Sequence, residues 1–118
     1  MSTTPQELRN RTKEFALRVV RLFRSLPRSP EAQVIGRQLL RSGTSVGANY
    51  RAACRARSRA EFVAKIGVVV EEADESAFWL ELLIETGTFK RDQVSSLLTE
   101  ALELTALFNA SRTTIKRG

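Results

Sequence analysis

Apolar side chains recur along most of this chain at alternating steps of four and three residues, the spacing that gathers them on one face of an α-helix. Four segments carry such a seam, separated by short polar links. The seams run over residues 8–26, 35–53, 62–83 and 94–115. No segment alternates strictly between apolar and polar residues, as a half-buried strand does. We therefore predict an all-α fold.

Residues that start and stop helices flank these segments. The starts are two capping boxes, Thr4-Pro5-Gln6-Glu7 and Ser58-Arg59-Ala60-Glu61, and the pair Ser29-Pro30; the stops are Pro27 and Gly87. Together they predict helices over about residues 5–26, 30–56, 59–86 and 91–115, in a single domain spanning residues 1–118. Four long helices with short turns predict an antiparallel up-down-up-down four-helix bundle.

The second segment contains two glycines and an asparagine where a helix is expected. Gly43 and Gly47 lie four residues apart, and Asn49 lies on the apolar seam. Glycine inside a helix costs about 1 kcal/mol relative to alanine, so close packing must compensate for this cost or the helix must bend near residues 42–44. We favour a continuous helix. A seam asparagine can fix the register or the partner of a helix, so these three residues are candidates for packing or for a subunit interface.

The charge is unevenly distributed along the chain. The net charge is +6, but residues 1–59 hold thirteen Lys or Arg against three Asp or Glu, whereas residues 60–118 hold six against ten. Such a chain can attract phosphate backbones, and it can also attract copies of itself head to tail. The candidate nucleic-acid-binding residues are Arg11, Arg18 and Arg21 on one side of the first helix, and Arg51, Arg55, Arg57 and Arg59 around the second turn. An ordinary solvated face is the alternative for the first helix.

The third segment carries candidates of a different kind. Glu71 and Glu75 lie one helical turn apart, a spacing that a metal site or an acid–base pair could use. A solvated or salt-bridged face, or an acidic docking surface for a basic partner helix, is the favoured interpretation. Phe78 and Trp79 lie beside the seam, either at the edge of the core or at a subunit contact.

The amino-acid composition excludes several kinds of catalytic and metal site. The sequence contains no histidine, which excludes Ser-His-Asp and Cys-His catalysis, His-containing zinc sites and Glu-x-x-His di-iron sites. Cys54 is the only cysteine, so we expect a small packing residue in a reducing cytoplasm. Neither a membrane span nor a secretory signal is indicated. We predict a cytoplasmic protein that is not an enzyme and uses no cofactor or metal.

The central stretch carries a family pattern. Its parts are Thr44-Ser45-Val46, Asn49, Arg57-Ser58 and Glu61-Phe62, followed by Ala73-Asp74-Glu75 and the run from Trp79 to Leu83. With these residues the chain resembles the four-helix-bundle family of 23S rRNA intervening-sequence proteins. The accessory variability determinant of diversity-generating retroelements belongs to the same superfamily. Arg51 and Ala52 stand where many relatives have an Ala-Glu pair, which makes the turn more basic.

The resemblance implies a bundle that assembles into a ring, typically a homopentamer. It also implies that some members bind nucleic acid and a reverse transcriptase. We therefore predict a non-enzymatic, ring-forming adaptor that binds RNA or DNA through its backbone with little sequence specificity. The alternative is a protein-only scaffold or accessory subunit, for example one that docks a reverse transcriptase. An enzyme is the weakest hypothesis.

Overall fold

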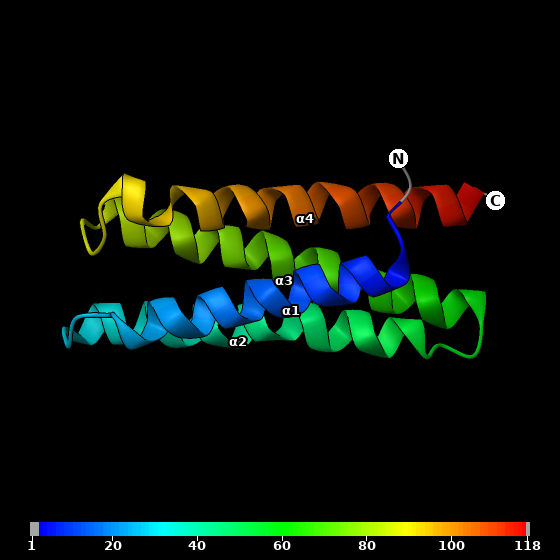
Figure 1. Ribbon diagram of the computed structural model, residues 1–118, viewed down its shortest axis with the longest axis horizontal. Coiled ribbons are helices and arrows are strands. Elements are labelled where there is room, and N and C mark those ends of the chain that lie inside the picture. The colour runs from blue at the N-terminus through cyan, green and yellow to red at the C-terminus, as the bar shows by residue number, and fades with distance from the viewer. Residues whose placement is uncertain (1–2, 118) are drawn as a thin grey trace.

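The computed structural model describes residues 3–117, which form four α-helices: α1 (Pro5–Arg24), α2 (Pro30–Cys54), α3 (Arg59–Glu85) and α4 (Arg91–Arg117). They run alternately up and down in an elongated bundle of 47 × 25 × 21 Å (Figure 1). The α2–α3 turn lies at the same end as the start of α1 and the end of α4 (Figure 1). The predicted all-α four-helix bundle is confirmed.

The helix ends differ from the predicted ones by one or two residues. Helices α1 and α2 stop at Arg24 and Cys54. In each case the next backbone N–H turns back to a carbonyl three residues earlier, from Ser25 to Leu22 and from Arg55 to Ala52, a tighter turn that ends the α-helix. Helix α3 stops one residue before the predicted end, and α4 extends two residues beyond it.

Side-chain capping is strongest at the two predicted capping boxes. The Thr4 hydroxyl accepts from the Glu7 N–H, and the Glu7 carboxylate accepts from the Thr4 N–H, which completes the first box. At α3, the Ser58 hydroxyl accepts from the Glu61 N–H. Ser29 is the N-cap of α2 but makes no side-chain capping bond. Local residues therefore set the starts of α1 and α3 directly.

The seams of the four helices form one apolar core. Its largest fully buried side chains are Phe15, Phe108, Leu39, Ile66, Leu80, Leu83 and Leu104. A polar pair lies within this core, because the buried Ser42 and Ser76 hydroxyls are 2.8 Å apart and hydrogen-bonded. This bond joins α2 to α3 and lets two buried polar groups satisfy each other. No helix in the described part of the chain is long and apolar enough to cross a membrane.

Helix α2 passes without a break through residues 42–44, and its glycines face α1. A Cβ on Gly43 would lie 2.8 Å from Cγ2 of Val19. A Cβ on Gly47 would lie 3.3 Å from the carbonyl oxygen of Thr12. Both glycines therefore let α1 and α2 approach closely within one chain.

Candidate nucleic-acid interface

Arg11 lies at the seam between α1 and α4 and is neutralised there. Its Nε and Nη2 atoms donate to the two oxygens of the Glu100 carboxylate at 2.7 and 2.8 Å, and Nη2 also contacts Glu103 at 3.2 Å. The hydrogen bond to Glu100 raises the pKa of Arg11 despite partial burial, so this guanidinium is firmly held as a cation. Arg11 thus serves the contact between α1 and α4, where few other residues meet.

The other two candidates on α1 also have partners. Arg18 donates through Nη2 to the Ser96 hydroxyl of α4 at 3.0 Å. Arg21 forms an exposed ion pair with Glu14 of its own helix at 3.3 Å. The proposed line of three cations is therefore divided between the α1–α4 seam and a local ion pair.

The arginines around the α2–α3 turn keep more of their charge available. Arg59 donates through Nη2 to the Ile115 carbonyl oxygen at 2.8 Å, which ties the turn to α4. Arg51, Arg55 and Arg57 form no ion pair within residues 3–115. All three are exposed at the end of α2 or in the turn. This end of the bundle therefore presents uncompensated positive charge.

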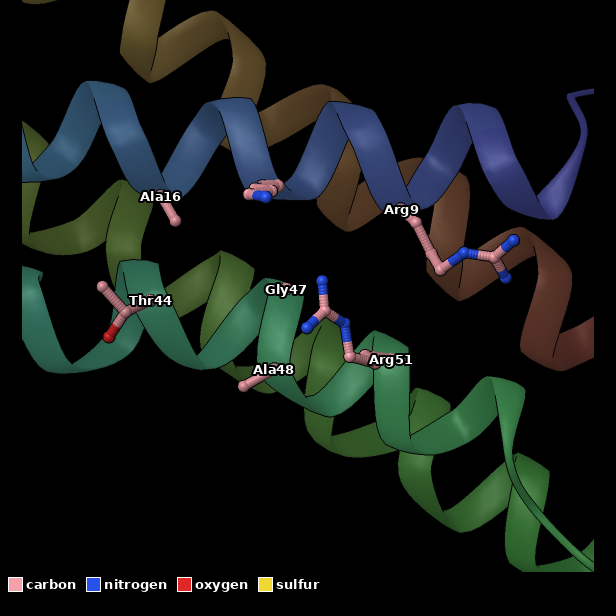
Figure 2. A pocket seen from close by; sticks show the side chains of 7 residues that line it. Arg9, Ala16, Thr44, Gly47, Ala48 and Arg51 are labelled. Carbon is pink, nitrogen blue, oxygen red and sulfur yellow. The ribbon is translucent and has the colours of Figure 1, made fainter.

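A cleft lies between α1 and α2 beside these arginines. It is lined by Arg9, Lys13 and Ala16 of α1 and by Thr44, Gly47, Ala48 and Arg51 of α2 (Figure 2). Its volume is about 260 Å³. A second hollow of about 310 Å³ shares Arg9 and Arg51 and adds Cys54 and Arg55. We call the two together the α1–α2 cleft, and none of the residues between 3 and 117 that line either part is acidic.

The sequence positions explain why four cations line this cleft. Arg9 and Lys13 lie one turn apart on α1, and Arg51 of α2 lies four residues before Arg55, the C-cap of that helix. Figure 2 shows the Arg51 side chain reaching from α2 toward α1. Arg9 donates through Nη2 to Gln6 at 2.7 Å and has no carboxylate partner in the described structure. An anion is the natural occupant of such a space.

Tyr50 lies buried close to the cleft and is not available for stacking. Only 4% of its surface is exposed, and its ring packs 5.1 Å from that of Phe108. Burial raises the pKa of Tyr50 to about 12, assisted by a hydrogen bond with the Cys54 thiol. Cys54 itself is exposed. The cleft therefore offers cations but no exposed aromatic ring.

Of the two acidic candidates on α3, only Glu75 forms part of a contact with α2. Glu75 accepts from Trp79 Nε1 at 2.9 Å and pairs with Arg41, which also reaches Glu72 at 3.0 Å. The Trp79 hydrogen bond, followed by Arg41, lowers the pKa of Glu75. Glu71 is exposed. The described residues contain no group of three or more acidic or cysteine side chains placed to hold a metal ion.

Two further candidates lie at the surface. Phe78 is 51% exposed and meets Trp79 edge to face, with ring centroids 4.9 Å apart. Asn49 is half-buried and donates to the Ser45 carbonyl oxygen of its own helix at 2.8 Å. Phe78 is therefore one of the large apolar side chains exposed on the outer surface.

Comparison with known proteins places this bundle in a family. The family model described as 23S rRNA-intervening sequence protein matches residues 6–110. The chain belongs to this family. A solved structure, that of a protein with unknown function from the S23 ribosomal protein family of Bacteroides thetaiotaomicron, is 38% identical with a TM-score of 0.85. The alignment covers 92% of this chain and 97% of that one. No curated protein matches the chain.

Two of the four cations that line the cleft in this family member, Arg51 and Arg55, were among the candidates from the sequence. Arg9 and Lys13 were not. The missed signal is helical phase. Arg11 and Arg18 each precede a seam residue and face α4, whereas Arg9 and Lys13 each follow one and face α2. The position of a cation relative to the seam does not by itself show which helix packs against that side of α1.

Proposed function

We propose that this family member is a non-enzymatic adaptor that binds nucleic acid, RNA in the first place, through phosphate contacts on the basic surface of α1, α2 and the α2–α3 turn. Recognition is of the backbone, so sequence specificity is low and binding weakens steeply with salt. The name of the family refers to ribosomal RNA, which makes a structured RNA the natural first ligand to test.

One observation carries this proposal: four cations, Arg9, Lys13, Arg51 and Arg55, line a cleft to which the described part of the chain contributes no carboxylate. Some other arginines of the chain are paired with acids, for example Arg11 and Arg41. Surface cations without acid partners repel one another, so they cost the folded state some stability. An anionic ligand removes that cost on binding.

The direct test is a titration of structured RNA with the purified protein at several salt concentrations. We expect binding at low salt, with the logarithm of the association constant falling linearly against the logarithm of salt concentration. Duplex and single-stranded DNA of matched length show whether RNA is preferred. Absence of binding at low salt, or binding indifferent to salt, refutes the proposal.

A scaffold that contacts only proteins is the second candidate, and the exposed Phe78 on α3 is the observation that favours it. In this version the basic half of one copy meets the acidic α3 of the next, closing a ring if the rotation permits. The homopentameric ring suggested by the family resemblance belongs to both candidates, whereas the docking of a reverse transcriptase belongs to this second one.

Charge reversal distinguishes the two candidates. Arg18, Arg21 and Arg24 lie on α1 outside the cleft. If reversing them dissolves an oligomer, these residues act in assembly. If it abolishes RNA binding while the oligomer remains, they contact nucleic acid directly. Light scattering for the mass and the RNA titration give the two measurements on the same samples.

A further inference from the structure

The α1–α2 cleft has the construction of a discrete binding site, which a merely basic surface lacks. Short side chains contribute to its lining, at Ala16, Gly47 and Ala48. The two helices approach closely there, since a Cβ on Gly47 would lie 3.3 Å from the Thr12 carbonyl oxygen. The long side chains of Arg9, Lys13 and Arg51 complete the lining, so cations border the opening.

We propose that the α1–α2 cleft holds one phosphate group of a nucleic-acid backbone, an inference that rests on the proposed function and assigns it a site. The Arg9 and Arg51 guanidinium groups, which line both parts of the cleft, donate to the phosphate oxygens. Lys13 and Arg55 flank them, one in each part, and add positive charge.

The partners of the four cations are consistent with this role. Arg9 uses Nη2 for Gln6, an exposed contact within α1, and keeps its other donors free. Arg51, Arg55 and Lys13 make no side-chain hydrogen bond to the residues that the structure describes. The phosphate therefore displaces water and breaks no ion pair.

The same geometry keeps the bases outside. The only tyrosine, Tyr50, is buried, and none of the described residues that line either part of the cleft is aromatic. Without a stacking surface, a base gains little by entering. The site therefore recognises the charge and geometry of the phosphate group and binds nucleic acid of any base sequence.

The phosphate could come from a polynucleotide or from a free polyphosphate, and Cys54 provides a reporter for both. Cys54 is exposed, lines the cleft and is the only cysteine in the chain. We would measure its rate of alkylation by iodoacetamide, a neutral reagent, in the presence of a single-stranded RNA oligomer, of inorganic tripolyphosphate, or of chloride at matched ionic strength. We expect RNA to slow the reaction and chloride to leave it unchanged.

Two variants test the site without relying on the thiol. Arg51→Gln should weaken RNA binding about tenfold and reduce its salt slope by about one. Ala48→Glu introduces a carboxylate at an exposed lining position and should weaken binding at least as much. Arg37→Gln is the matched control, because Arg37 is exposed on the same helix but outside the cleft.

The outcomes separate this inference from the proposed function. If RNA protects Cys54, and Arg51→Gln and Ala48→Glu weaken binding while Arg37→Gln does not, the site is supported. If RNA binds both cleft variants as tightly as the parent protein, the cleft assignment is overturned while nucleic-acid binding stands. If tripolyphosphate protects Cys54 but RNA does not bind, the nucleic-acid source is overturned. If neither ligand binds, both proposals fail.

Discussion

At the scale of single residues, Gly43 of α2 packs directly against Val19 of α1. Gly43→Ala brings a methyl group to 2.8 Å from Cγ2 of the fully buried Val19. Alanine favours the helix by about 1 kcal/mol, but the overpacking costs about 1–3 kcal/mol. We expect a net loss of stability, measured as a lower midpoint of urea unfolding.

Gly67 offers the control for that substitution. It lies inside α3, and a Cβ there would meet only the side chain of Arg112, at 3.4 Å. Gly67→Ala should therefore keep the gain in helix propensity and raise the urea midpoint. Equal effects of the two substitutions would contradict the close α1–α2 contact.

We expect the Tyr50 phenol to lose its proton at a higher pH than an exposed tyrosine does. Burial raises its pKa from the usual 10.0 to about 12. The folded protein then holds a proton that the unfolded chain has released, so the stability that this group contributes is full below pH 10 and is lost as the pH rises toward 12. Tyr50 is the only tyrosine, so the near-ultraviolet absorbance of phenolate measures its titration directly. A midpoint at the usual value would contradict its burial, and Tyr50→Phe should remove the signal.

At the scale of helices, the α2–α3 contact depends on Glu75 remaining ionised. The hydrogen bond from Trp79, followed by Arg41, lowers the pKa of Glu75 below the usual 4.5. This stabilisation is present above pH 4.5 and is lost as the pH falls through the lowered value. Glu75→Gln should therefore lose stability at neutral pH and show a smaller further loss in acid, measured by urea unfolding across the acid range.

Glu71→Gln is the control for this effect. Glu71 is exposed on the same helix and forms no ion pair within the described residues. The substitution should therefore leave the dependence of stability on pH close to that of the parent protein. If both variants behave alike, the Arg41–Glu75–Trp79 contact contributes nothing measurable.

The helices themselves could be predicted from the sequence because the features that determine them are local. The four-three seam and the Thr4 and Ser58 caps act within one helix, so spacing and residue type suffice. The cleft could be predicted only in part, because it depends on which helix lies beside which. The sequence alone did not show that Gly47 would meet Thr12, and hence that Arg9 would stand opposite Arg51.

At the scale of the whole molecule, folding pairs some of the positive charges of the first half of the chain with negative charges of the second half. The bundle brings Arg11 of the basic half to Glu100, and Arg41 to Glu72, so each of these cations meets an acid from the other half of the chain. The end of the bundle that carries Arg51, Arg55 and Arg57 receives no such partner from the described residues. A large anion can therefore reach several cations together at this end, where they have no ion-pair partner among the described residues.

Assembly of copies is the last property to test, and Phe78 is the residue to change. With 51% of its surface exposed beside Trp79, Phe78 contributes little to the core but offers a large apolar contact. If copies associate through this face of α3, Phe78→Glu should lower the mass measured by light scattering toward the 13.2 kDa of one chain. Val34→Glu is the control, since Val34 is 60% exposed on α2. An oligomer that survives Phe78→Glu but dissociates in high salt would instead assign assembly to the opposite charges of neighbouring copies.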